Sequence, residues 1–257
     1  MNTAYLLGSD PRYTVLSRLL TEEGFTVFTQ PPPTAGAVPA LYLFPFRTGE
    51  EEILRWLENA ATGSLAAIGH GSERLRETCR ARGIHLFPLL EEEAYLTANA
   101  RETAQGVLTE LLCRTDRLLD ELTVLITGFG RCGRELCRLL WLCGAEVWVH
   151  SNEGSKRRAA EEGWNTCPFP DPCLAMFDLV INTATSPLFD AETLSLLRED
   201  AVIYQVASGR AGFTEEGAKD PRILPLPAMP GKHVSQSEGE LLFRLLLQKM
   251  KESEGFL

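Results

Sequence analysis

Residues 124–158 read VLITGFGRCGRELCRLLWLCGAEVWVHSNEGSKRR, and this stretch decides the fold of the chain around it. It begins with a short apolar run typical of a buried strand, passes through a glycine-rich turn into a segment with helical periodicity, and ends in a second apolar strand. A strand, a turn, a helix and another strand in this order predict a βαβ unit, in which two parallel strands are joined by a right-handed crossover.

The turn in this unit has the pattern G-x-G-x-x-G. Gly128 permits the sharp bend, Gly130 lets the backbone approach a pyrophosphate, and Gly133 lets helix and strand pack closely. The free N–H groups at the helix start favour an anion. The pattern therefore predicts a dinucleotide site, and a Rossmann-type fold that binds no nucleotide is the alternative. The predicted pyrophosphate-binding residues are Gly128, Phe129, Gly130, Arg131, Cys132 and Gly133.

The residues after the second strand indicate which nucleotide binds. An acid at this place would accept hydrogen bonds from the ribose of NAD, whereas a basic group suits the 2′-phosphate of NADP. The chain offers Ser151 and Asn152 here, followed by Lys156 and Arg157. We therefore predict that these four residues bind the ribose end of the cofactor and favour NADP over NAD. Lys156 and Arg157 can also be read as a solvated first turn of a helix.

Composition and charge exclude several classes of protein. The chain has 257 residues, 44% of them apolar, and a formal net charge of -10, which is typical of a soluble globular protein. An acidic chain without a basic face is not expected to bind nucleic acid, and no apolar run is long enough to span a membrane. We expect a cytoplasmic protein. Its seven cysteines include no C-x-x-C pair, so no metal site is predicted.

Strands and helical segments alternate along the whole chain, which predicts an α/β fold with two doubly wound Rossmann-like lobes and parallel sheets. We expect the first lobe at residues 1–98, completed by a C-terminal helix at 234–257. A long interdomain helix is expected at 99–119. The nucleotide-binding lobe is then expected at 120–233.

Several stretches outside the glycine turn resemble one family over nearly the whole chain. They are GSDPRYTVLSRLL, GFGRCG, DLVINTATSPLF, VASGRAG and LPAMPGKHVSQSEGELL. In their order and spacing they resemble the A subunit of dipicolinate synthase, a sporulation protein related to D-2-hydroxyacid dehydrogenases. This resemblance implies an NAD(P)-dependent oxidoreductase subunit that acts on dihydrodipicolinate-type pyridine dicarboxylates. It also implies that a flavoprotein-like B subunit is the partner, and dehydrogenases of this type suggest a homodimer by analogy.

The same resemblance suggests further site residues. D-2-hydroxyacid dehydrogenases have their acid/base histidine in a turn before the last helix, where this chain has His233. The arginine of their A-R-G turn corresponds here to Ser208, which we expect with Thr183 near the ribose-nicotinamide half of the cofactor. His70 is interpreted as a turn histidine. The predicted substrate-binding residues, which we expect between the lobes, are Arg47, Asn99, Arg210 and Lys232.

Two functions from different classes remain open at this point. The intact glycine turn favours an oxidoreductase. The substrate-side stretches differ from the family pattern, for example in ASGRAG around Arg210, and this favours a non-catalytic subunit that binds a nucleotide or a partner protein.

Overall fold

The structure is a computed structural model that describes residues 2–34, 36 and 38–253, and it divides into two compact units. The first unit contains the chain up to Asn99 together with the segment from Val234 onward, and the second contains Ala100–His233. One helix, α4 (Glu93–Arg114), begins in the first unit and ends in the second.

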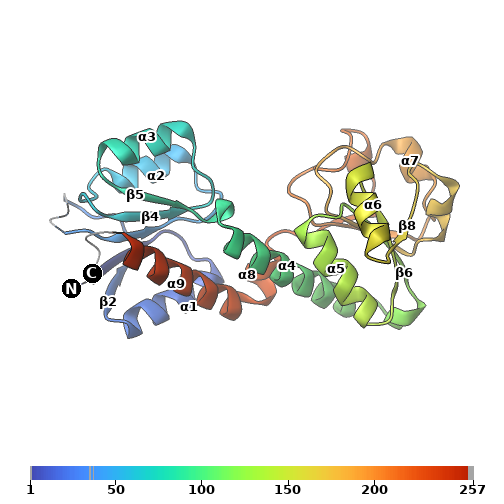
Figure 1. The fold of residues 1–257 in the computed structure, drawn as a ribbon, viewed down its shortest axis with the longest axis horizontal. Helices are drawn as coiled ribbons and strands as arrows, with labels where there is room; N and C mark the ends of the chain where they lie inside the picture. The colour runs from blue at the N-terminus through green and yellow to red at the C-terminus, as the bar shows by residue number, and fades with distance from the viewer. Residues whose placement is uncertain (1, 35, 37, 254–257) are drawn as a thin grey trace. The chain divides into compact units, whose positions relative to one another are not determined.

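The first unit has a five-stranded parallel sheet between two pairs of helices. Its strands lie in the order β2-β1-β3-β4-β5. In Figure 1, α2 and α3 cover one face of this sheet, and α1 and α9 cover the other. The strands are β1 (Asn2–Leu6), β2 (Phe25–Phe28), β3 (Leu41–Leu43), β4 (Leu65–Ile68) and β5 (His85–Pro88). The helices are α1 (Pro11–Glu22), α2 (Glu50–Leu57), α3 (Glu73–Ala81) and α9 (Ser235–Glu252).

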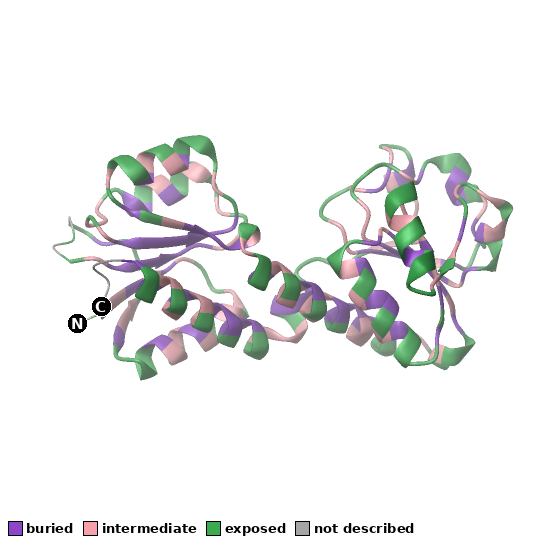
Figure 2. Cartoon of the chain, in the orientation of Figure 1, coloured by how far each residue is buried: buried purple, intermediate pink, exposed green. Residues whose placement is uncertain are grey.

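Each face of this sheet has its own apolar core. Leu16 of α1 and Leu242 of α9 pack on one face, while Trp56 of α2 and Leu75 of α3 pack on the other. The central strands β3 and β4 are buried along their whole length, and the outward sides of α2 and α3 are exposed, as Figure 2 shows. Burial on both faces explains why these strands are continuous apolar runs with no alternation.

A buried ion pair fixes the C-terminal helix on the first unit. The Glu238 side chain, in the first turn of α9, is completely buried, and its Oε1 accepts hydrogen bonds from Arg12 Nη1 at 2.7 Å and Tyr95 OH at 2.6 Å. Arg12 also binds Asp10, the residue that caps α1. One carboxylate thus connects α1, α4 and α9, which come from distant parts of the sequence.

The second unit has a six-stranded parallel sheet in the order β11-β10-β9-β6-β7-β8. Counted from β6, this is the doubly wound order of a dinucleotide-binding fold, and its topological switch point lies between β6 and β9. The strands are β6 (Thr123–Thr127), β7 (Glu146–His150), β8 (Asn165–Thr166), β9 (Leu179–Asn182), β10 (Val202–Gln205) and β11 (Ile223–Pro225). The helices besides α4 are α5 (Arg131–Leu142), α6 (Glu153–Glu161), α7 (Ala191–Ser195) and α8 (Met229–His233). Short 3-10 turns span Leu89–Glu91, Leu119–Glu121, Pro172–Met176 and Gly217–Lys219.

The predicted fold class is confirmed, because both sheets are parallel and the last helix packs in the first unit. Local differences remain. The helix expected over residues 99–119 runs from Glu93 to Arg114. The two-residue strand β8 was missed because so short a run has no periodicity. The helix α8 was also missed, and His233 is its last residue where a turn was expected.

The structure also bears on metal and membrane binding. Among the described residues, no group of three or more His, Cys, Asp or Glu side chains could hold a metal ion. Within the same part of the chain, no helix is long and apolar enough to cross a bilayer.

The buried pair around Glu238 leads to a stability prediction. We expect Glu238→Ala to lower the free energy of unfolding by about 3 kcal/mol, because it leaves the charge of Arg12 without its buried partner. Urea unfolding at pH 7 measures this change. The matched control is Glu240→Ala, an exposed position two residues away on α9, which we expect to shift stability by at most about 0.5 kcal/mol. Equal effects of the two substitutions would contradict the role given to Glu238.

Candidate functional site

The glycine turn lies at the switch point of the second sheet, between the end of β6 and the start of α5. Gly128 has a φ of +93°, and its N–H donates to His150 O at the end of β7 at 2.7 Å. Gly130 is the N-cap residue of α5, and no side chain caps this helix end. The helix start therefore presents N–H groups that are available to an anion.

The three glycines differ in what a side chain would meet. A Cβ on Gly133 would overlap the carbonyl oxygen of Gly128, so the helix can pack on the turn only without one. A Cβ on Gly128 would meet Thr183 Oγ1 at 2.7 Å. At Gly130, in contrast, no described atom lies within 4 Å of the Cβ position. The protein itself does not need glycine at 130, and the open space there fits a cofactor pyrophosphate.

A buried polar network shapes the loops beside this turn. Asn182, at the end of β9, accepts a hydrogen bond from Thr127 Oγ1 at 2.6 Å and donates to Gln205 Oε1 at 2.8 Å. Asn182 also donates to Ala211 O at 2.8 Å, so it holds the loop after β10. Sequence analysis missed this network, although a polar residue ends each of the three neighbouring apolar strands, which is the signal that could have revealed it.

Two predicted residues lie on these loops. Thr183 is half-buried, and its hydroxyl donates to Thr127 O at 2.9 Å, so it supports the turn from β9. Ser208 is exposed on the loop after β10. Both follow the carboxyl ends of parallel strands next to the switch point, which is where ligands bind in open α/β sheets.

The end of β7 has no carboxylate close to the turn. Asn152 caps α6 by accepting a hydrogen bond from Ser155 N at 3.0 Å. Glu153 points to solvent, with 94% of its side chain exposed, and lies 3.9 Å from Lys156 Nζ. Lys156 is half-buried, whereas Arg157 is exposed. The cation near the strand end is thus more buried than the acid.

His150 is the last residue of β7 and stacks on Phe169, with ring centroids 4.5 Å apart. Its Nδ1 lies 3.1 Å from Cys167 O. Burial lowers the pKa of His150, so the ring is neutral at pH 7. It therefore offers a flat neutral surface beside the turn rather than a charge.

A second cluster in the same unit surrounds the carboxylate of Glu110 on α4. Glu110 Oε1 lies 2.7 Å from His233 Nε2 and also contacts Lys232 Nζ. Its Oε2 accepts a hydrogen bond from Arg114 Nε at 2.9 Å. Hydrogen bonds from Lys232, Arg114 and His233 lower the pKa of Glu110 to about 2. Glu110 is therefore an anion throughout the neutral range.

Glu110 is the acid partner of His233 that sequence reasoning could not identify. It comes from a helix more than 100 residues earlier in the chain, and nothing in TELLCR marks it as different from a solvated glutamate. The helices approach closely because Gly106 has no side chain; a Cβ there would meet Met229 O at 3.0 Å. The geometry matches a histidine oriented by a carboxylate, with 17% of the His233 side chain exposed.

The remaining predicted residues are distributed over both units. In the second unit, Lys232 binds Glu110, and Arg210 is exposed, with Glu215 at 3.9 Å. In the first unit, Arg47 is exposed after β3, and Asn99 Oδ1 lies 3.4 Å from Tyr95 OH, which donates its proton to Glu238. His70 is exposed after β4, as expected for a turn histidine. Within the glycine turn, Phe129 is buried, Cys132 is half-buried and Arg131 is exposed.

The class of the second unit follows from its fold and its turn together with a comparison of families. Residues 95–218 match the family model described as D-isomer specific 2-hydroxyacid dehydrogenase, NAD binding domain. This unit is therefore similar to the NAD-binding domains of D-isomer specific 2-hydroxyacid dehydrogenases. No curated protein sequence matches the chain.

Solved structures extend the likeness to both units. The A chain of dipicolinate synthase from Bacillus subtilis has a TM-score of 0.79 at 20% identity, over 98% of this chain and 97% of that chain. The corresponding protein from Bacillus halodurans has a TM-score of 0.78 at 19% identity, over 96% and 97%. A transhydrogenase from Sinorhizobium meliloti has a TM-score of 0.63 at 14% identity, over 98% and 93%. The resemblance predicted from the sequence is confirmed for the fold.

The low pKa of Glu110 predicts how its contribution to stability depends on pH. The pKa is about 2 in the folded protein against 4.5 for a free glutamate, so the contribution is complete above pH 4.5 and disappears as pH falls toward 2. Glu110→Gln should therefore be less stable than wild type at pH 7, and the difference should shrink below pH 4.5. Urea midpoints measured from pH 7 to 2.5 test this.

The control is Glu161→Gln, which changes a glutamate with 68% of its side chain exposed. Its urea midpoint should stay close to wild type at every pH. A constant difference between Glu110→Gln and wild type down to pH 2.5 would contradict the lowered pKa of Glu110.

Proposed function

We propose that this protein is an NAD(P)-dependent oxidoreductase subunit that acts on a dihydrodipicolinate-type pyridine dicarboxylate. The open space at Gly130, in front of an uncapped helix start, is the observation that carries this proposal. It is supported by the dehydrogenase-type family match and by the fold shared with the A subunits of two dipicolinate synthases.

The turn residues would bind the cofactor. The N–H groups at Gly130, Arg131 and Cys132 would donate to the pyrophosphate, with Gly128 and Gly133 keeping the turn and helix close enough to do so. Phe129 is buried under the turn and would support it from below. When bound, the nicotinamide supplies hydride transfer, and the protein orients it and excludes water.

NADP is the favoured form of the cofactor. Asn152 has an amide, and its side-chain oxygen caps α6. The carboxylate of Glu153 extends into solvent, so it does not face the position of the ribose. Lys156 and Arg157, in the first turns of α6, supply the cations that a 2′-phosphate requires, and Ser151 can donate a hydrogen bond to it.

His233 is the proposed acid/base residue. Its Nε2 faces Glu110, so the carboxylate can hold one tautomer of the ring and stabilise its protonated form. The substrate carboxylates would bind cationic and polar side chains, of which Arg47, Asn99, Arg210 and Lys232 are the candidates. Thr183 and Ser208 would contact the ribose-nicotinamide half of the cofactor from the ends of β9 and β10.

A flavoprotein-like B subunit is the proposed partner, since the structures with the same fold are the A subunits of dipicolinate synthases. The second candidate function is a non-catalytic subunit that binds a nucleotide or a partner protein. One observation favours it. Arg114, Lys232 and, when protonated, His233 are all paired with Glu110. These ion pairs also hold α8 against α4, so they can have a purely structural role.

A binding measurement tests the cofactor site. Gly130→Asp should weaken NADP(H) binding by roughly 100-fold, about 2.8 kcal/mol, because a carboxylate would occupy the space of the pyrophosphate. The fold should not change, since no described atom lies near the Cβ position and φ at Gly130 is -82°. Isothermal titration calorimetry with NADP(H) and NAD(H) measures the affinities.

The matched control is Gly49→Asp in the first unit. Gly49 also precedes a helix and also has open space at its Cβ position, but it belongs to no predicted cofactor site. It should bind nucleotide like wild type. Unchanged nucleotide affinity in Gly130→Asp, or no nucleotide binding by wild type, would contradict the proposed function.

A kinetic measurement tests the role of His233. With the B subunit present, His233→Ala should lower turnover by roughly 100-fold or more while nucleotide affinity stays constant, because the proton transfer loses its acid/base group. His70→Ala, an exposed histidine of the first unit, is the control. If His233→Ala turns over like wild type, His233 has no part in the chemistry.

A further inference from the structure

A pocket of about 500 Å³ opens at the edge of the second sheet where its strands begin. Asp178 immediately precedes β9, Leu122 immediately precedes β6, and Val202 is the first residue of β10, and all three line the pocket. The glycine turn follows the other end of β6, and the strands are parallel. The pocket therefore lies at the opposite edge of the sheet from the proposed cofactor site.

The pocket combines an apolar floor with a charged rim, which is typical of small-molecule sites. Its volume is also within the range of such sites, roughly 300–1,000 Å³. The apolar lining comes from Leu111, Leu122, Leu179, Val202 and Leu224. The charged lining consists of three arginines, Arg114, Arg117 and Arg198, and three aspartates, Asp116, Asp178 and Asp200. All of these residues belong to the second unit.

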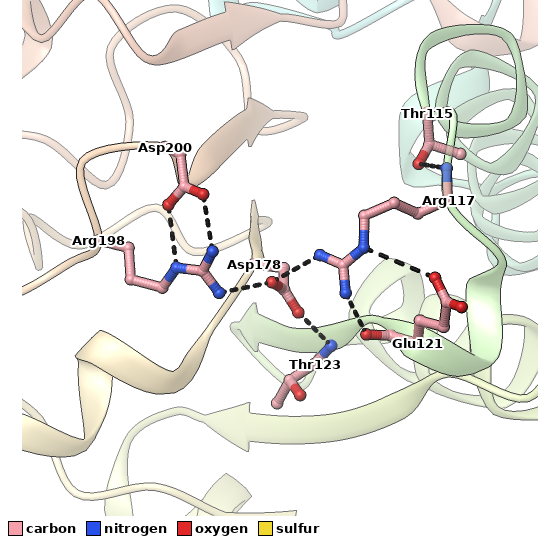
Figure 3. Close-up of polar contacts among 7 residues, drawn as sticks. All are labelled: Thr115, Arg117, Glu121, Thr123, Asp178, Arg198 and Asp200. Carbon is pink, nitrogen blue, oxygen red and sulfur yellow. Dashed lines mark hydrogen bonds and ion pairs between the residues drawn. The ribbon is translucent and has the colours of Figure 1, made fainter.

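Two guanidinium groups of the rim converge on one carboxylate, as Figure 3 shows. Asp178 Oδ1 accepts from Arg117 Nη1 at 2.8 Å and from Arg198 Nη1 at 2.7 Å, and its Oδ2 accepts from Thr123 N at 2.9 Å. The Asp178 side chain is only 11% exposed. It therefore acts as a fixed anchor that holds both guanidinium groups beside the pocket.

The other carboxylate partners of these arginines are exposed surface groups. Asp200, which binds Arg198, has 70% of its side chain exposed, and Glu121, which binds Arg117, has 54% exposed. Exposed ion pairs contribute little to stability, about 0–1 kcal/mol each. Arg198 donates to both oxygens of Asp200, and Arg117 also donates to the backbone oxygen of Glu121 at 2.6 Å. A carboxylate ligand would have to compete with these solvent-exposed contacts, while Asp178 keeps the arginines in place.

Tyr204 adds a hydrogen-bond donor to the pocket. This residue lines the pocket and is only 2% exposed, yet its hydroxyl makes no hydrogen bond within the described part of the chain. Burial raises the pKa of Tyr204, so the hydroxyl keeps its proton at neutral pH. The hydroxyl oxygen itself is not fully buried, so it can donate to solvent or to a ligand that enters the pocket.

Arg114 connects the pocket to His233. It lines the pocket, and its Nε and Nη2 both lie 2.9 Å from Glu110 Oε2. The other oxygen of Glu110 faces His233 and Lys232. A ligand anion that draws Arg114 toward the pocket would leave Glu110 with fewer cations around it. Glu110 would then interact more strongly with a protonated His233 ring.

We propose that this pocket is a second ligand site, which binds a small organic carboxylate with a flat apolar body. Binding there would change the interaction between Glu110 and His233, because Arg114 contacts both the pocket and Glu110. The apolar floor takes the body of the ligand, and Arg117, Arg198 and the Tyr204 hydroxyl bind its carboxylate. The site is independent of the proposed cofactor and substrate, so its test does not require enzymatic activity.

The first test uses 2-naphthoate as the probe, titrated into the full chain by calorimetry. We expect saturable binding with one site per chain, and no binding of naphthalene-2-carboxamide, which has the same shape without the charge. Binding should persist when NADP(H) is present. Absence of naphthoate binding, equal binding of the amide, or displacement of naphthoate by nucleotide would each overturn the proposal.

Two variants test whether the probe binds in this pocket. Arg198→Ala and Tyr204→Phe should each weaken naphthoate binding, by roughly tenfold for the charge-assisted contact and less for the hydroxyl. Both should remain folded, since Arg198 is 40% exposed and phenylalanine preserves the buried ring. Arg138→Ala, a surface arginine of α5 that does not line this pocket, is the control and should bind like wild type. Equal affinity in all three variants would mean that the probe binds elsewhere.

The second part of the proposal is tested by NMR of the histidine rings at constant pH. The chain has four histidines, so the ring signals of His233 can be assigned with a single His233→Gln variant. Naphthoate should shift these signals toward those of a protonated ring in wild type. In Arg114→Gln the probe should still bind, but the His233 signals should not move. An unchanged His233 spectrum on binding to wild type would overturn the coupling.

Discussion

The packing of α5 on the glycine turn is the constraint on which the nucleotide-binding unit depends. A side chain at Gly133 would overlap the carbonyl oxygen of Gly128, so the first turn of the helix can reach the strand end only when position 133 lacks one. This close approach places the N–H groups at the start of α5 beside Gly130. The ends of β9 and β10 are joined by the hydrogen bond between Asn182 and Gln205, and β9 contacts the glycine turn through Thr183.

The helix α4 has a comparable role for the chemistry of this unit. Glu110 provides the anion that His233 lacks in the local sequence, and Arg114, one turn later, lines the pocket at the other edge of the sheet. Because Glu110 contacts both Arg114 and His233, ligand binding in that pocket can affect the protonation of the histidine. In the first unit, Glu238 likewise joins elements that are distant in sequence.

Much of the fold could be predicted because its determinants are local. Apolar runs of strand length separated by helical periods predict parallel sheets, and both sheets have this form. The three glycines could be assigned roles because their spacing reflects backbone geometry within a few residues. Short elements such as β8 and α8 have too few residues to show a period. The acid partner of His233 could not be found, because Glu110 resembles any other helix glutamate until α8 packs against it.

The sequence by itself determined the doubly wound architecture, the position of the glycine turn and the absence of an acid directly at the end of the second strand of the nucleotide-binding unit. These features depend on the order of residues along short segments. Only the tertiary structure decided which charges meet: Glu110 with His233, Arg12 with Glu238, and Asp178 with two arginines. The physical reason is that an ion pair depends on a distance of a few ångströms between side chains, and the packing of remote helices and strands sets that distance.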